Sequence, residues 1–283
     1  ETGYRLHQRK SIIMTKQRVV VTGLGCLTPI GCNKDDFWKS LLEGKSGAKT
    51  IDFLDVDKLP VKFSASVKDF QSDKYFDKKD LKKMALFMQY GMAAGIDAVA
   101  DAKLLESQCN PDRIGVSIGS GIGGLYNIEN TRDTFIKSGS RRISPFFVPA
   151  SIINMISGNL SIKYGFKGPN LSIVTACTTG THNIGEGFRQ IQYSHADVMI
   201  CGGAEMATSD LGVGGFAAAR ALSTRNDSPE TASRPWDKDR DGFVLGDGAG
   251  VIVLEELEHA KKRGAKIYAE INGYGMSADA YHM

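Results

Sequence analysis

The chain has 283 residues, of which 42% are hydrophobic and 24% are charged, as in a soluble globular protein with one large domain or two modest ones. Its net charge of +3, from 35 basic and 32 acidic residues, is too small to indicate nucleic-acid binding, so any basic site must be a local patch. No apolar run reaches the roughly 18 residues that cross a bilayer, and we expect no membrane role.

The N-terminal segment, residues 1–13, is basic after its first residue and lacks the apolar core of a secretory signal. We interpret Met14 as the natural start and residues 1–13 as an extension, left by cloning or by an upstream start, in preference to a short organellar targeting stretch. The five cysteines include no C-x-x-C pair, which argues against a disulfide framework and a structural zinc site. We expect a cytoplasmic protein without a bound metal.

Apolar strands alternate with amphipathic segments after Met14, which is typical of an α/β fold. A strand is predicted over 18–25, a helix over 35–44, and helical three- and four-residue spacing continues over 77–104. Further strands are predicted over 112–121, 170–177, 196–205, 242–257 and 265–275. The charged segment 258–265 is either a short helix or a linker.

Glycines follow the strand predicted over 112–121, and Gly119, Gly121 and Gly124 match the G-x-G-x-x-G spacing of a dinucleotide-binding turn. That fingerprint usually follows the first strand and needs an acidic residue at the end of a second strand about 20 positions later. The stretch 128–149 is no buried strand, so we do not expect a nicotinamide or flavin cofactor. These glycines are interpreted as room for backbone to approach a ligand or another strand.

Cys177 is the strongest candidate for chemistry, because a strand that leads into a helix places the next residue at an exposed helix N-terminus. Free backbone N–H groups there stabilise a thiolate and can hold an oxyanion. The small residues from Thr178 to Thr181 leave space for an acyl group over the sulfur. Cys26, Cys109 and Cys201 are interpreted as small buried hydrophobic residues.

No histidine is placed by its local pattern as a base for Cys177. His182 is five residues further on, and at about 100° per residue this spacing turns it away from Cys177 on a helix, so we interpret it as structural. His195, His259 and His282 lie in polar or charged stretches or at the end of the chain. The base and the groups that steer a second substrate are therefore not visible in the sequence.

Long motifs in a fixed order resemble the β-ketoacyl-[acyl-carrier-protein] synthases of the type II, thiolase-like family. These motifs run from Arg18 to Met283 and include "RVVVTGLG", "GSGIGG", "ISPFFVP", "VTACTTGTHNIGEG", "GGAEMA", "GVGGFAAARALSTRND" and "SRPWDKDRDGFVLGDGAG". The resemblance implies two similar α/β halves in α-β-α-β-α layers, each with a mixed five-stranded sheet, in a homodimer. It divides this chain into an N-terminal half over 14–258 and the start of a second half over 259–283.

The resemblance implies that Cys177 takes an acyl chain from acyl carrier protein as a thioester, and that malonyl-carrier protein then loses carbon dioxide and extends the chain by two carbons. Two histidines and a lysine of the second half promote this step in the family. Their motifs, and a glycine-rich gating loop, do not occur before Met283. We therefore expect a truncated or incomplete sequence, and we expect the 283-residue chain to be unable to condense substrates alone. No cofactor is implied.

Two sets of site residues follow from the resemblance. The acyl pocket is assigned to Ile122, Phe147, Ala207, Gly212 and Phe216, with Phe147 contributed across the dimer. Acyl carrier protein, which is acidic, is expected to bind basic residues, with Lys79, Lys82 and Lys83 on one helix face. The remaining basic positions are Arg141, Arg142 and Arg220.

Two alternative functions remain open. A non-catalytic thiolase-fold partner subunit would share the fold and the dimer surface but normally lacks the cysteine, so Cys177 argues against it. A degradative thiolase would act on coenzyme A esters, and the "TACTTG" motif together with the basic residues argues against that activity.

Overall fold

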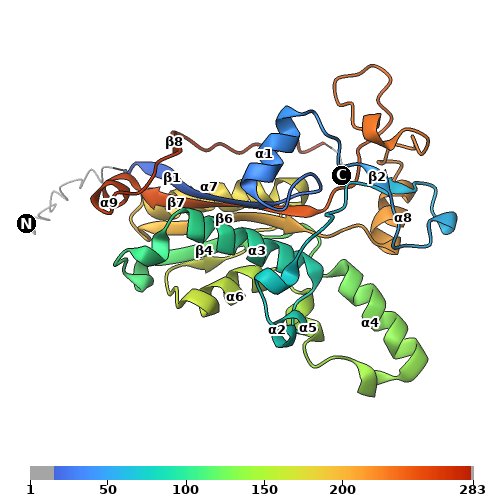
Figure 1. The fold of residues 1–283 in the computed structure, drawn as a ribbon, viewed down its shortest axis with the longest axis horizontal. Helices are drawn as coiled ribbons and strands as arrows, with labels where there is room; N and C mark the ends of the chain where they lie inside the picture. The colour runs from blue at the N-terminus through green and yellow to red at the C-terminus, as the bar shows by residue number, and fades with distance from the viewer. Residues whose placement is uncertain (1–15, 282–283) are drawn as a thin grey trace, which may run out of the picture.

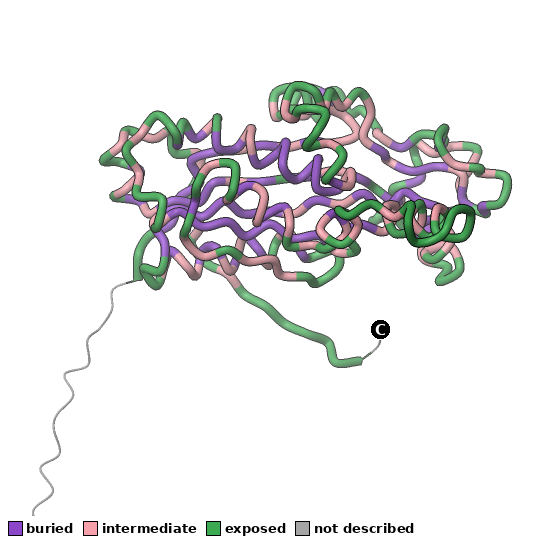
Figure 2. Tube along the Cα trace, turned by 90° about the horizontal axis from the view of Figure 1, so that it is seen from below, coloured by how far each residue is buried: buried purple, intermediate pink, exposed green. Residues whose placement is uncertain are grey.

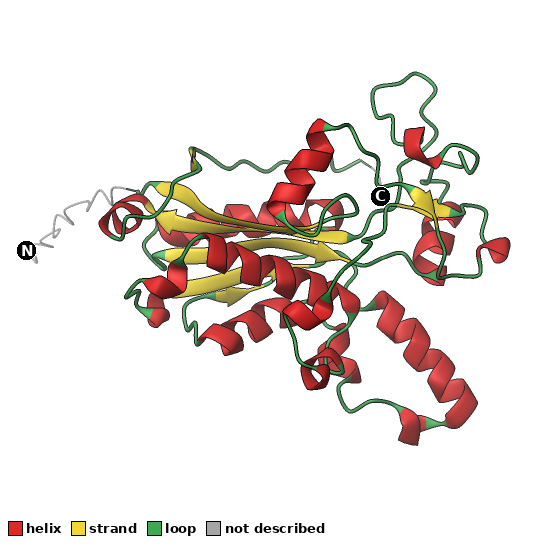
Figure 3. Ribbon diagram, in the orientation of Figure 1, coloured by secondary structure: helices red, strands yellow, loops and turns green. Residues whose placement is uncertain are grey.

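The computed structural model describes residues 16–281, so the expectations for Met14 and for residues 1–13 lie outside the described residues. Figure 1 shows a central sheet with helices on both faces and a smaller unit beyond one end of the sheet. Figure 3 shows that strands form the middle layer and helices form the layers on either side. This is the α/β architecture that the sequence predicts.

The central sheet has six strands in the order β5-β4-β6-β7-β1-β8. They are β1 (Val19–Leu27), β4 (Ile114–Gly119), β5 (Asn170–Leu171), β6 (Val198–Glu205), β7 (Gly248–Glu256) and β8 (Ala269–Ile271). Strand β4 is parallel to β5 and β6, whereas β7 is antiparallel to β6 and β1, and β8 is antiparallel to β1. The sheet is mixed, as expected, but it has six strands where five were expected, because β8 pairs with β1 at its edge.

The helices of the described residues are α1 (Lys34–Leu42), α2 (Lys78–Leu81), α3 (Leu86–Asp101), α4 (Leu125–Ser138), α5 (Phe147–Ser151), α6 (Met155–Tyr164), α7 (Thr179–Gln192), α8 (Asp210–Ala218) and α9 (Leu257–Lys262). Of these, α3 and α6 cover one face of the sheet and α7 covers the other. Strand β6 shows how the core divides: Val198 and Ile200 pack with α3 and α6, whereas Met199 and Cys201 pack with α7. Side chains that alternate between the faces of a strand thus bury both layers. Figure 2 shows this buried interior along the middle of the molecule.

The smaller unit lies beyond the carboxyl ends of β4 and β6. It contains the hairpin of β2 (Lys49–Thr50) and β3 (Phe63–Ser64), together with α8. Phe63, Val213, Leu222 and Leu245 form a separate apolar cluster there. This cluster places α8 beside the end of the sheet at which α7 begins.

The helix predicted over 77–104 is broken, which corrects one expectation. Asp77 caps α2, and α2 ends at Leu81, whereas α3 begins at Leu86 after Ala85 adopts an extended conformation. The charged turn stays exposed while α3 is almost wholly buried, so the two parts face different surroundings. Lys79 lies on α2, Lys82 is its C-cap and Lys83 follows in the next turn, so all three precede the break.

Some of the other predicted helices and strands are confirmed, and others are shorter than predicted. The strands over 18–25, 112–121 and 196–205 and the helix over 35–44 are confirmed. The strand predicted over 242–257 begins only at Gly248, and the one over 265–275 shortens to β8. The charged segment that follows β7 forms most of α9.

Candidate active site

Cys177 lies in a short 3-10 turn, η6 (Ala176–Thr178), that leads directly into α7. Its side chain is exposed, whereas Cys201 is buried and Cys26, Cys32 and Cys109 are half-buried. Within the described chain no side chain caps α7, which leaves its first-turn N–H groups available to an anion. The predicted place of Cys177 at a helix start is confirmed.

The four other cysteines have thiols that resist ionisation. Burial raises the pKa of Cys26 to about 11, with help from Asp97. Burial also raises the pKa values of Cys32, Cys109 and Cys201. Cys177 is the one exposed cysteine among the described residues, and a nucleophilic thiol must be accessible to its substrate.

The segment between β5 and Cys177 is held by side chains in place of strand pairing. Buried Asn183 accepts a hydrogen bond from the Ile173 N–H (3.0 Å) and donates one to the Ile173 carbonyl (2.9 Å). The Thr175 N–H donates to the Thr179 hydroxyl (2.9 Å). The strand predicted over 170–177 therefore ends at Leu171, because α7 satisfies the backbone that a neighbouring strand would otherwise pair.

The histidines of the described chain are engaged elsewhere. His182 Nδ1 lies 2.7 Å from the Thr175 hydroxyl, which agrees with the structural role expected for it. His195 bonds to Gln190 (3.1 Å) and His259 bonds to Glu255 (2.6 Å). None of these three lines the cavity at Cys177.

Cys177 opens onto a cavity of about 710 Å³ with mostly apolar walls. The cavity lies where the carboxyl ends of β4 and β6 meet the start of α7. One wall consists of Phe216 and Phe243, whose rings pack edge to face with centroids 5.2 Å apart. A cavity of this volume is large enough for a small organic chain.

The structure brings together three of the five expected acyl-pocket residues. Ile122, Ala207 and Phe216 line the Cys177 cavity. Gly212 lies behind the wall, where a Cβ atom would collide with the Ala207 carbonyl, so this glycine lets α8 approach. Phe147, at the start of α5, is not among the cavity-lining residues of this chain.

The glycine segment after β4 wraps around a carboxylate. Glu205, at the end of β6, accepts hydrogen bonds from the Gly121 N–H (2.8 Å), the Ile122 N–H (3.0 Å) and the Ser120 hydroxyl (2.7 Å). Burial raises the pKa of Glu205, although these bonds act in the opposite direction. The glycines thus make room for an internal carboxylate as well as for close backbone approach.

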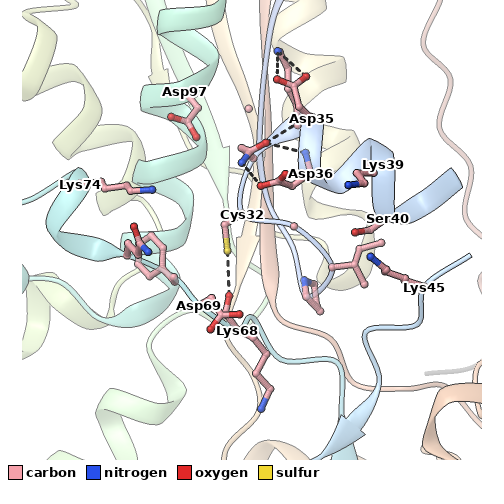
Figure 4. A pocket seen from close by; sticks show the side chains of 18 of the residues that line it. Cys32, Asp35, Asp36, Lys39, Ser40, Lys45, Lys68, Asp69, Lys74 and Asp97 are labelled. Atoms are coloured by element: carbon pink, nitrogen blue, oxygen red, sulfur yellow. Dashed lines mark hydrogen bonds and ion pairs between the residues drawn. The ribbon is translucent and has the colours of Figure 1, made fainter. Parts of the chain in front are cut away.

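A second cavity, of about 950 Å³, lies between α1 and α3 and is lined by charged side chains (Figure 4). The Cys32 thiol borders it and donates to the Lys68 carbonyl (3.1 Å). Lys34 pairs with Asp35 (3.2 Å) at its edge. The Cys32 thiol is thus engaged in a hydrogen bond, and charged side chains of both signs line the cavity. This larger cavity is therefore poorly suited to bind an apolar acyl chain for transfer to a cysteine.

The expected carrier-protein residues all lie on exposed segments. Lys79 is on α2, Lys82 ends that helix, and Lys83 pairs with Asp80 (2.9 Å). Arg141 and Arg142 form a short turn after α4, and Arg220 follows α8 with a φ of 55°. Their role in binding a partner stays a prediction.

Residues 16–281 contain neither a helix that could span a membrane nor a cluster that could bind a metal ion. No helix there is both long enough and apolar enough to span a bilayer. No cluster of three or more His, Cys, Asp or Glu side chains in that range could hold a metal ion.

Several residues of the site have no local pattern that identifies them. Phe243 stands in a run that predicts a strand, yet it lines the cavity from a loop. Asp247 is buried and accepts hydrogen bonds from the Ala207 N–H (2.8 Å) and the Thr208 N–H (3.1 Å), which fixes the turn after β6. Like Asn183 and Glu205, it acts through contacts with residues distant in sequence.

Curated relatives match nearly the whole chain. A 3-oxoacyl-[acyl-carrier-protein] synthase 2 of Vibrio cholerae is 59% identical over 270 residues, which are 95% of this chain and 65% of that protein. The protein of the same name from Synechocystis is 49% identical, with the same two coverages of 95% and 65%. The chain therefore spans about two thirds of the length of these relatives.

Solved structures and a family model agree with these relatives. A β-ketoacyl synthase from Burkholderia phymatum superposes with a TM-score of 0.84 at 33% identity and covers 94% of this chain and 66% of that one. A ketosynthase bound to a hexaketide, in complex with its type II acyl-carrier protein, gives 0.81 at 30% identity, over 95% of this chain and 65% of that one. The model of the β-ketoacyl synthase N-terminal domain matches residues 16–260. The fold, the exposed Cys177 and these matches together show that the chain belongs to the β-ketoacyl synthase family.

Proposed function

We propose that this protein elongates fatty acids by decarboxylative condensation, with Cys177 as the residue that carries the growing acyl chain. The observation that carries the proposal is the exposed Cys177 thiol at the start of α7, open to an apolar cavity of about 710 Å³. The names of the curated relatives support this activity. Because the chain spans 65% of the Vibrio cholerae relative, the activity is proposed for the whole protein.

The proposed reaction has two stages. The Cys177 thiolate attacks the carbonyl carbon of an acyl-carrier-protein thioester, and the carrier leaves as its thiolate while a new thioester forms on Cys177. Malonyl-carrier protein then loses carbon dioxide, and its carbanion attacks that thioester. The carbon–carbon bond forms as the carbon–sulfur bond breaks, which returns the Cys177 thiolate and releases a 3-ketoacyl product longer by two carbons. First-turn N–H groups of α7 stabilise negative charge during the first stage.

Decarboxylation in this proposal depends on groups beyond the described residues. The three described histidines, His182, His195 and His259, do not line the Cys177 cavity. We therefore assign the nucleophile and much of the acyl cavity to residues 14–258. The groups that promote loss of carbon dioxide are assigned to the second half, which begins near residue 259.

The cavity walls suit a hydrocarbon chain. Ile122, Ala207 and Phe216 present apolar atoms to it, and Gly212 lets α8 form its wall. Each methylene buried there would contribute about 0.8 kcal/mol, so the depth of the cavity decides which chain lengths are accepted.

The proposed partners are acyl carrier protein and a second copy of the chain. Exposed Lys79, Lys82, Lys83, Arg141, Arg142 and Arg220 suit an acidic carrier protein. One structural relative was solved with its acyl-carrier protein, which supports this partner. Exposed Phe135 and Ile136 on α4 and Val148 on α5 suit a homodimer surface, to which we assign Phe147. The free cysteines fit a cytoplasmic location.

Acyl transfer to Cys177 is the direct test of this function. Full-length protein is incubated with acyl-carrier protein, and intact mass followed by peptide mapping locates the acyl group. We expect one acyl group, on the peptide that contains Cys177, and none on Cys177→Ser. Cys32→Ser serves as the matched control, because Cys32 borders the other cavity.

The identity of the acyl donor distinguishes the proposed function from that of a thiolase. Acyl-carrier protein should transfer faster than the same acyl group on coenzyme A. Transfer to another cysteine, or faster transfer from coenzyme A, would reject the proposed function.

A further inference from the structure

Glu205 is a half-buried carboxylate that the proposed chemistry does not use, although it lines the Cys177 cavity. It ends β6 and points into the loop that joins β4 to α4. Its two oxygens accept hydrogen bonds from the N–H groups of Gly121 (2.8 Å), Ile122 (3.0 Å) and Gly123 (3.3 Å) and from the Ser120 hydroxyl (2.7 Å). These four donors belong to consecutive residues, so one side chain fixes the whole loop.

The loop has the form of an anion-binding nest, in which successive backbone N–H groups point at one negative group. Its occupant here is the chain's own Glu205. Gly121 is needed for this arrangement, because a Cβ atom on it would lie 2.8 Å from Glu205 Oε2. Charge-assisted bonds from several donors hold such a loop more firmly than neutral ones.

This loop contacts the Cys177 site at two places, the wall of the cavity and the turn that carries Cys177. Ile122 is 40% exposed and lines the cavity. Gly121 lies against Ala176, since an added Cβ atom would be 3.2 Å from the Ala176 carbonyl oxygen. Ala176 precedes Cys177 and has a φ of 53°, a strained value for a residue with a Cβ atom. A displaced loop would therefore alter both the cavity wall and the turn that carries the nucleophile.

We propose that Glu205 is a positioning residue for acyl-chain selection. It holds Ile122 as a rigid wall of the acyl cavity and supports the turn that presents Cys177. The hydrogen bonds given for Glu205 come from residues 120–123, so it acts through the loop. The role in chain selection rests on the proposed function, whereas the anchoring of the loop does not.

Anchoring of the loop is tested first, by hydrogen exchange. Glu205→Gln keeps the size of the side chain but replaces one acceptor oxygen with an NH₂ group, which faces N–H donors. We expect exchange of the peptide that spans Gly121 to Gly123 to quicken about tenfold or more. Ser120→Ala, which removes one donor, should cause a smaller change of the same sign. The control is Glu256→Gln, because Glu256 accepts from the His259 N–H (2.7 Å) at α9, away from the cavity.

Chain selection is tested by a double-mutant cycle in the full-length protein. Ile122→Phe should slow acylation of Cys177 by a long primer while sparing a short one. In the Glu205→Gln background the same substitution should cost about tenfold less, because an unanchored loop lets the phenylalanine move aside. Glu256→Gln should leave the cost of Ile122→Phe unchanged.

An equal cost of Ile122→Phe in all backgrounds, or unchanged exchange of the Gly121 to Gly123 peptide in Glu205→Gln, would overturn the inference. Failure of the proposed function would look different, because wild-type Cys177 would then take up neither primer. The exchange measurement decides on the anchoring in that case too.

Discussion

The cavities at Cys32 and at Cys177 differ in nearly every respect other than that each borders a cysteine. The cavity at Cys32 is larger, about 950 Å³, and charged side chains of both signs line it (Figure 4). The cavity at Cys177 is smaller, about 710 Å³, and mostly apolar. Cys32 donates to a carbonyl and burial raises its pKa, whereas Cys177 is exposed at a helix start. The setting of the thiol, and not the volume of the cavity, is the reason that we assign the proposed acyl transfer to Cys177.

Replacing the cysteine at each cavity by serine should give the largest difference in condensation rate. Cys177→Ser should lower condensation by about 10³-fold or more, because a serine hydroxyl ionises far less readily than a thiol. Radiolabelled malonyl-carrier protein and full-length protein give the measurement. Cys32→Ser should keep wild-type condensation. An equal loss of condensation activity in the two variants would contradict the assignment of the nucleophile to Cys177.

A change of shape at the Cys177 cavity should have the next largest effect. Ile122→Phe should slow acylation by long primers on the order of 100-fold, because room for about four methylenes at about 0.8 kcal/mol each is lost. Short primers should react nearly as before. Rates of acyl transfer over a series of chain lengths give the measurement, and a uniform loss at every length would contradict it.

Charge reversal outside both cavities should have a smaller effect. Lys82→Glu combined with Lys83→Glu should slow association with acyl-carrier protein about tenfold and flatten its dependence on salt. Lys83 already pairs with Asp80, so Lys82 should account for more of the change. Surface plasmon resonance at several salt concentrations gives the rates. The matched control is Lys39→Glu combined with Lys45→Glu at the Cys32 cavity, and an equal effect there would show that only net charge matters.

The smallest effect is expected at Glu255, which lines neither cavity. Buried Glu255 binds His259 (2.6 Å) and Arg263 (2.6 Å), and the hydrogen bond to Glu255 raises the pKa of His259 above 6.5. A group with a raised pKa stabilises the fold below its unfolded value, and this contribution is lost as the pH rises through the folded value. The free energy of unfolding should thus fall by about 1 kcal/mol as the pH rises above about 6.5.

At acid pH the same network should make the free energy of unfolding rise with pH, which is opposite to the trend expected for His259. Burial tends to raise the pKa of Glu255, but the bonds from Arg263 and His259 outweigh burial and hold it below 4.5. Its contribution is therefore present above pH 4.5 and lost as the pH falls through the folded value. Urea unfolding from pH 4 to pH 9 gives the measurement. His259→Gln should remove the fall on the alkaline side, and an unchanged curve would contradict the assignment.

The fold was largely predictable where a pattern is local. Apolar runs predict β1, β4 and β6 because these strands are buried on both faces. The break between α2 and α3 was not predictable from spacing, because apolar periodicity continues through Met84 while the backbone turns at Ala85. The early end of β5 depends on Asn183, whose partner Ile173 is ten residues away.

The candidate site was predictable in one part only. The position of Cys177 between a strand and a helix follows from neighbouring residues, and the structure agrees. Glu205 meets Gly121 across 84 residues of chain, and Phe243 meets Phe216 only because two loops converge. Spacing along the chain carries no information on such contacts, so these residues emerge only from the folded structure.

The most direct test of the central claim is competitive alkylation of the cysteines in the full-length protein. Limiting iodoacetamide near neutral pH is followed by peptide mapping, with and without prior loading by an acyl-carrier protein. The account predicts that the peptide with Cys177 is modified first, and that prior acylation protects it. Modification of Cys26, Cys32, Cys109 or Cys201 first, with no protection of Cys177 by the acyl primer, would contradict its role as the nucleophile.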